Sequence, residues 1–155
     1  MTTVTERFTE ALFDMLDETF EHVHGVYLDR GTSLFETLAD VSAEMASLPV
    51  SASCASLAAQ VEHVRFYLEV LERSITNQPV GEVDWGEIWR TVRAVTPDEW
   101  VLSQRRLKET YVRITAYLCG LETWEGEDEV GGAMAILVHT AYHLGEIRQA
   151  LCTLK

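Results

Sequence analysis

Two histidines separated by one helical turn offer the clearest chemistry in the sequence. His139 and His143 stand four residues apart in a segment with a helical apolar pattern, so their rings lie on one face and can share one metal ion. With five histidines in 155 residues, such a pair arises by chance about one time in six. A third ligand must therefore come from elsewhere in the chain.

His63 is the candidate third ligand. On a second predicted helix it lies about 100° around the axis from the apolar positions Val64 and Leu68. His139 and His143 are displaced around their helix in the same sense from the apolar positions Leu137 and Leu144. The face that carries His63 and the face that carries this pair can therefore converge on one cleft. Three protein ligands with an open fourth position are typical of catalytic zinc sites, and imidazole also suits nickel, iron and copper. For each histidine taken alone, a hydrogen-bonded, partly buried side chain is the alternative.

The other two histidines receive no role. His22 and His24 are two residues apart near a helix end, which places them on nearly opposite faces, and we expect them at the surface or beside the helix dipole. Glu21 and His24 form one E-x-x-H motif. A di-iron site needs two such motifs and further inward glutamates, and the second motif is absent from the sequence.

Three residues near these histidines are candidate catalytic groups. Glu146 follows His143 by one turn and is a candidate partner for its ring, while Arg148 is a candidate anion-binding group. Tyr67, one turn after His63, is a candidate for orienting a ligand or donating a proton. Ordinary ion pairing and core packing are the alternatives for these residues.

Two tryptophans lie in a long predicted loop, residues 77–95. Trp85 and Trp89 are candidates for the wall of a substrate pocket, with simple packing as the alternative. The same loop contains Asp84, which we expect to begin one short helix.

Composition excludes several classes of partner. Acidic residues outnumber basic ones 25 to 12, and the formal net charge of -13 would repel phosphate backbones and anionic lipids. No apolar run approaches the roughly 20 residues that cross a bilayer, and the N-terminal segment has no signal-peptide pattern. We therefore expect a cytoplasmic protein that binds neither nucleic acid nor membranes.

The three cysteines indicate neither a disulfide framework nor a metal site. Cys54, Cys119 and Cys152 are odd in number and widely spaced. Free cysteine usually behaves as a small apolar residue, so we expect reduced and mostly buried thiols.

Apolar spacing and capping signals predict an all-α fold. The first helix begins at a capping box formed by Thr3 and Glu6 and is predicted to end near Gly25. A second box, at Thr96 and Glu99, opens the third. The four predicted helices span about residues 4–24, 55–75, 97–120 and 130 to nearly the C-terminus, with a further short helix near 34–41. We expect one four-helix bundle covering residues 1–155, an architecture that often builds metal sites from facing helices.

Three stretches of sequence resemble the DinB-like superfamily, also called the YfiT-like family of proposed metalloenzymes. The C-terminal segment HTAYHLGEIRQAL, residues 139–151, is similar to the family's last-helix motif. The resemblance extends to LAAQVEHVRFYLEVLERS around His63 and to SLFETLADVSAEMASLPVS before it. It therefore covers most of the chain.

The resemblance implies a four-helix bundle of up-down-down-up type and a divalent metal held by His63, His139 and His143. Nickel or zinc is the expected metal, with iron, manganese or copper as alternatives. Relatives include S-transferases and isomerases that use small thiols such as bacillithiol, mycothiol or glutathione, and many members have no known activity. Relatives often form homodimers, which is the state we expect here.

The expected function is accordingly a metal-dependent enzyme that acts on a small-molecule substrate with a low-molecular-weight thiol, as an S-transferase or isomerase. A coordinated thiol loses its proton, and a coordinated water becomes far more acidic. A metal-dependent hydrolase and a non-catalytic metal-binding or dimerising bundle are the alternatives.

Overall fold

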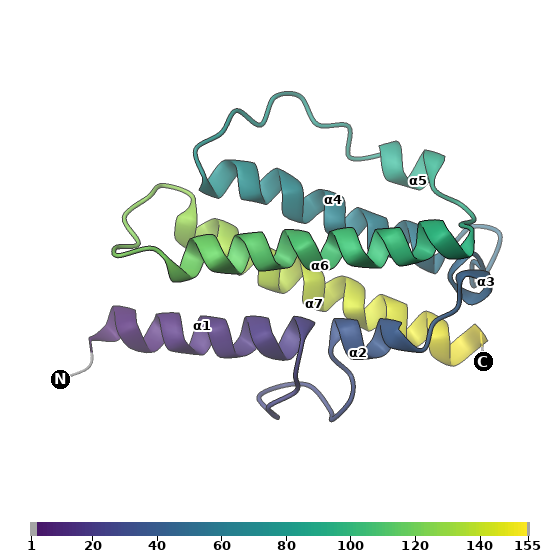
Figure 1. The fold of residues 1–155 in the computed structure, drawn as a ribbon, viewed down its shortest axis with the longest axis horizontal. Helices are drawn as coiled ribbons and strands as arrows, with labels where there is room; N and C mark the ends of the chain where they lie inside the picture. The colour runs from purple at the N-terminus through teal and green to yellow at the C-terminus, as the bar shows by residue number, and fades with distance from the viewer. Residues whose placement is uncertain (1–2, 155) are drawn as a thin grey trace.

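The computed structural model describes residues 3–154, and within this range the chain is all-helical. Its long helices run roughly along the length of the molecule (Figure 1). They are α1 (Val4–Phe20), α4 (Leu57–Ile75), α6 (Pro97–Cys119) and α7 (Glu129–Leu154), and three short helices join them: α2 (Leu34–Ala39), α3 (Ala43–Ala46) and α5 (Glu87–Thr91). Helix α4 packs against both α6 and α7, and α1 packs against α7. None of these helices combines the length and apolarity needed to cross a bilayer.

The capping signals place the helix starts as predicted. Thr3 with Glu6 and Thr96 with Glu99 form reciprocal capping boxes, and Pro97 occupies the first turn of α6. Helices α4 and α6 keep their predicted bounds within two residues. The four-residue helix α3 is too short to show periodicity and was not predicted.

The first helix ends at Phe20, so the predicted end near His24 is wrong. The cause is Glu18, which is fully buried near the end of α1. Its carboxylate accepts backbone N–H bonds from His24, Val26, Tyr27 and Leu28 at 2.6–2.9 Å. The chain therefore leaves the helix and folds back around this carboxylate instead of adding another turn.

The helix predicted to begin at Asp84 begins later. Gly86 is the N-cap of α5, and Asp84 supports the preceding turn by accepting the backbone N–H of Gly86 at 3.0 Å. Asp84 also pairs with Arg90 in the last turn of α5. The aspartate thus stabilises this short helix without capping it directly.

The core lies where α1, α4, α6 and α7 meet. Phe20 of α1 stacks on Tyr111 of α6 with ring centroids 4.2 Å apart. Trp100, 3% exposed, donates its indole N–H to the Val41 carbonyl at 2.6 Å and so ties α6 to the segment after α2. These contacts fix the frame on which α4 and α7 face each other.

The cysteine prediction is wrong, because Cys54, Cys119 and Cys152 are all exposed. On their helices Leu118 and Leu151 take the buried positions. The residue that follows each of them is turned by about 100° and faces outward. Cys54 lies in the segment before α4.

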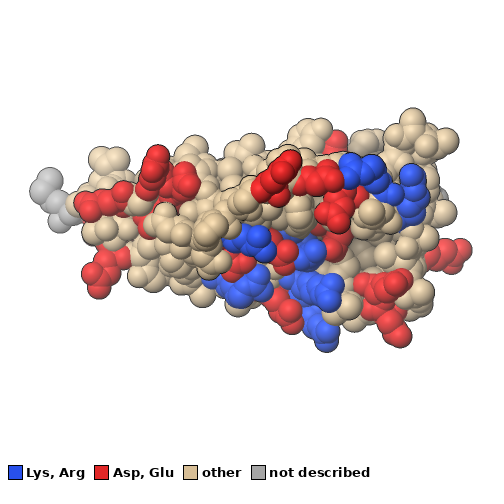
Figure 2. Space-filling model, turned by 90° about the horizontal axis from the view of Figure 1, so that it is seen from above, with Lys and Arg blue, Asp and Glu red and all other residues tan. Residues whose placement is uncertain are grey.

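Charged side chains of both signs share the surface. On the face in Figure 2, acidic side chains extend along the molecule and basic ones gather near the middle and at one end. Basic side chains pair with neighbouring carboxylates: Arg65 bonds Glu62 and Glu69 on α4, and Arg113 of α6 bonds Glu72 at 2.8 Å. The Arg65 pairs lie within α4, and the Arg113–Glu72 pair joins α4 to α6 at the surface.

The contact between α4 and α7 predicts opposite effects for two adjacent glycines. A Cβ at Gly132 would clash with Cγ2 of Ile75, a stiff, buried side chain of α4, whereas a Cβ at Gly131 meets nothing within 4 Å. We expect Gly132→Ala to lower the free energy of unfolding by about 1–3 kcal/mol and Gly131→Ala to raise it by about 0.5 kcal/mol. Urea denaturation of both variants measures this. Equal changes in the free energy of unfolding for the two variants would contradict the close approach of α7 to α4 at Gly132.

Candidate metal centre

Helices α4 and α7 bring the three predicted ligands together. His63 lies on α4, and His139 and His143 lie one turn apart on α7. One ring nitrogen from each lies within 4.8 Å of the others, and the Nε2 atoms of His63 and His139 are 3.2 Å apart. The predicted convergence of the three histidines is confirmed.

The spacing of these nitrogens fits a shared ion. Two imidazole nitrogens bound tetrahedrally at 2.0–2.1 Å from zinc would lie about 3.3 Å apart, close to the 3.2 Å between Nε2 of His63 and of His139. Three imidazoles also form a donor set that suits zinc, nickel and related divalent ions. The residues present are therefore able to hold such an ion.

Burial keeps the three rings neutral. It lowers the pKa of His63 to about 4 and that of His139 to about 3, and the neighbouring His143 lowers both further. Burial also lowers the pKa of His143, although the Glu146 carboxylate opposes this. At neutral pH each ring therefore has a lone pair available for a metal.

His143 is oriented by hydrogen bonds behind the ring. Its Nδ1 lies 2.7 Å from Oε1 of Gln60 and 2.9 Å from Oε2 of Glu146. With Nδ1–H donating to these oxygens, Nε2 carries the lone pair and is available to an ion. The structure thus places Glu146 where the sequence suggested. Gln60 was not anticipated, and its only signal is its position one turn before His63 on α4.

Aromatic rings cover the other two histidines. Tyr67 stacks on His139, with ring centroids 3.5 Å apart and planes 8° apart, and Trp89 lies over His63 at 4.3 Å. Tyr67 thus contacts the histidine of the opposite helix, not the one that precedes it on α4. Trp85, 46% exposed, contacts the Tyr67 ring at 5.7 Å but no histidine.

Arg148 is not brought to the histidines. It lies five residues after His143, about 140° around the helix axis, and lines a separate hollow of about 380 Å³ together with Leu28 and Cys152. Its predicted part in anion binding at the metal centre has no contact to support it. His22 and His24 lie near Asp17 at the end of α1, as expected for surface residues.

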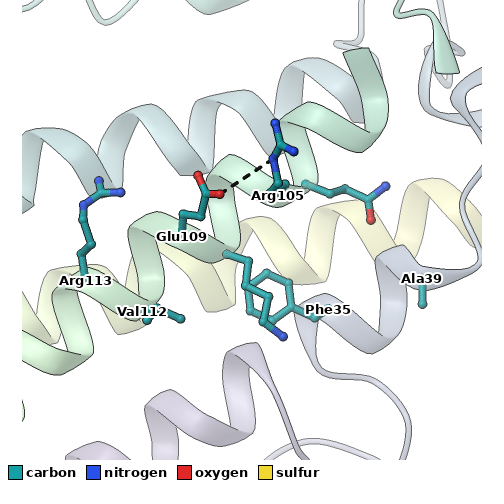
Figure 3. Close-up of a pocket in the computed structure, with 8 residues that line it drawn as sticks. Phe35, Ala39, Arg105, Glu109, Val112 and Arg113 are labelled. Carbon is teal, nitrogen blue, oxygen red and sulfur yellow. Dashed lines mark ion pairs between the residues drawn. The ribbon is translucent and has the colours of Figure 1, made fainter. Parts of the chain in front are cut away.

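A larger cavity, about 800 Å³, lies away from the histidines between α2 and α6. Figure 3 shows Phe35 and Ala39 on one side and Arg105, Glu109 and Val112 on the other, with Arg105 paired to Glu109. Its charged side chains are engaged in ion pairs at the surface. The larger cavity is therefore not the site that has metal-binding side chains.

Fold and site together define an all-helical protein with a largely buried cluster of three neutral histidines able to bind a metal. No protein-family model, curated protein or solved structure matches the chain. The function is therefore inferred from the chemistry of the site.

Proposed function

We propose that this chain is a divalent-metal-dependent enzyme of the DinB-like type, which transfers or isomerises small molecules with a low-molecular-weight thiol. The supporting observation is the convergence of His63, His139 and His143, all neutral, from two packed helices. In this proposal α1, α4, α6 and α7 form the four-helix bundle that the sequence resemblance implies.

The three imidazoles would hold the ion and leave coordination positions for a substrate atom. A bound divalent ion would lower the pKa of a thiol held there and so supply a thiolate nucleophile near neutral pH. In a transfer reaction the sulfur forms a bond to an electrophilic carbon, the leaving group departs with its bonding pair, and the thiol proton goes to solvent.

The surrounding residues have distinct tasks in this proposal. Gln60 and Glu146 fix the tautomer and orientation of His143 by accepting its Nδ1–H. Tyr67 and Trp89 cover two histidine faces and limit the water around the site. The large cavity beside α2 has no part in this chemistry.

A thiol-transfer assay tests the proposal. Protein loaded with zinc or nickel is incubated with a chloronitroarene and with cysteine, glutathione or a similar thiol, and thioether formation is followed by absorbance. We expect the loaded protein to form thioether at least about tenfold faster than the metal-free protein, because metal activation of a nucleophile contributes several kcal/mol.

His143→Ala with the same total metal is the control for activity of the free ion. Equal rates for loaded and metal-free protein with every thiol and electrophile would contradict the transferase. Cleavage of a model ester without thiol would favour the hydrolase instead. Stabilisation by metal without any reaction would favour a structural metal site.

A further inference from the structure

The three histidines are held in place in two different ways. Nδ1 of His143 has two oxygen partners, on Gln60 and Glu146. Nδ1 of His63 and of His139 are buried and have no hydrogen-bond partner among the residues that the structure describes. Metal-binding histidines usually donate this second N–H to a carboxylate or carbonyl, which fixes the ring. Two of the three rings therefore need another means of orientation.

Aromatic rings instead cover the faces of these two imidazoles. The phenol of Tyr67 lies flat on His139, 3.5 Å between centroids at 8°, and the indole of Trp89 covers His63 at 4.3 Å and 32°. Tyr67 is part of α4, whereas Trp89 comes from α5, which packs along α4 on the outside of the molecule (Figure 1). One of the two rings is thus supplied by a separate, short segment.

We propose that Tyr67 and Trp89 are positioning residues for the metal site, and that metal binding in turn holds α5 against α4 through the contact between the rings of Trp89 and His63. This inference rests on the proposed metal centre and adds a coupling between that centre and α5. The stack restricts the plane of each imidazole, so the rings spend more time in the orientation that an ion requires.

The coupling follows from the electronics of the stack. An imidazole that donates its lone pair to a cation becomes electron-poor, and the faces of indole and phenol rings attract positive charge. Each stack is therefore stronger in the loaded protein than in the free one. Because linkage is reciprocal, an aromatic ring that stabilises the metal-bound state raises the affinity for the metal. Bound metal in turn strengthens the contact of that aromatic ring with its histidine.

Helix α5 is suited to respond to this coupling. It has five residues, no side-chain cap at its N-terminus and one buried residue, Ile88. Within α5 only Ile88 and Trp89 are not exposed, so the Trp89 contact is a large part of the attachment of this helix. Its backbone amides should report whether a metal is bound at His63.

The first measurement is zinc affinity, by competition with a coloured chelator. We expect Trp89→Leu to bind zinc about tenfold more weakly than the unmodified chain, within the range seen for lost partners of metal ligands, and Trp89→Phe to stay within about threefold, since it keeps a ring on His63. Trp124→Leu is the matched control, because it makes the same replacement at a tryptophan that packs on Phe13 of α1. Its affinity should be unchanged. Circular dichroism checks that each variant folds.

The second measurement is hydrogen exchange of the α5 amides with and without zinc. Zinc should slow exchange of residues 87–91 in the unmodified chain and in Trp89→Phe, but not in Trp89→Leu. If Trp89→Leu binds zinc as tightly as the unmodified chain, and zinc slows exchange of its residues 87–91 to the same extent, this inference is overturned and the metal centre is left intact. Absence of zinc binding by the unmodified chain would overturn both.

Discussion

His139→Ala is expected to weaken zinc binding at least about 100-fold, since it removes one of three nitrogen donors, and loss of a mere partner of a ligand already costs 10–100-fold. The unmodified chain should gain about 2.7 kcal/mol of stability at a free zinc concentration 100 times its dissociation constant. For a domain of this size that corresponds to a rise in Tm of roughly 5–10 °C. Thermal unfolding with and without zinc measures both effects.

His22→Ala is the matched control for that substitution. His22 is 74% exposed at the end of α1, far along the chain from the cluster, and its replacement should leave the zinc-dependent rise in Tm unchanged. A full zinc-dependent rise in His139→Ala would mean that zinc binds elsewhere.

Glu18→Ala is expected to lower the free energy of unfolding at pH 7 by about 2–4 kcal/mol, because it leaves four backbone N–H groups of the segment after α1 without their acceptor. Glu10→Ala is the control, since Glu10 is exposed on the same helix. Urea denaturation measures the difference. A loss no larger for Glu18→Ala than for Glu10→Ala would contradict the structural role of the buried carboxylate.

The effect of Glu18 should also depend on pH. Burial would raise the pKa of the Glu18 carboxyl, but the four N–H donors outweigh it and lower that pKa from 4.5 to about 2. A carboxyl whose pKa is lower in the folded state than in the unfolded chain stabilises the fold fully at pH values above its unfolded-state pKa. This contribution is lost as the pH falls towards the folded-state pKa. The stability difference between the unmodified chain and Glu18→Gln should therefore be constant above about pH 5 and shrink between about pH 4.5 and 2. A constant difference down to pH 2 would contradict this assignment.

Local patterns in the sequence predicted most of the helical framework. Capping boxes such as Thr96 with Glu99 act within one turn, and apolar periodicity identifies a helix whose face is buried, so both are readable without a structure. The same holds for His139 and His143, whose common face follows from helical geometry. Predicting His63 as a ligand required the further inference that its helix face meets the face of His139 and His143. Helices α4 and α7 do pack together.

The features that the sequence did not reveal depend on contacts between distant residues. Glu18 ends α1 by bonding backbone groups up to ten residues away, which no helical pattern encodes. Gln60 resembles any surface glutamine until α7 is placed beside it. Arg148 looked close to His143 along the chain, but it faces another side of the helix. The DinB-like resemblance and the expected homodimer stay predictions.

The central claim is that three imidazoles share one ion. Anomalous diffraction from crystals grown with one equivalent of zinc tests it most directly. We predict a single strong peak between His63, His139 and His143, with one nitrogen of each ring at about 2.0–2.1 Å. A peak at other residues, or no peak near these rings at full zinc occupancy, would contradict it.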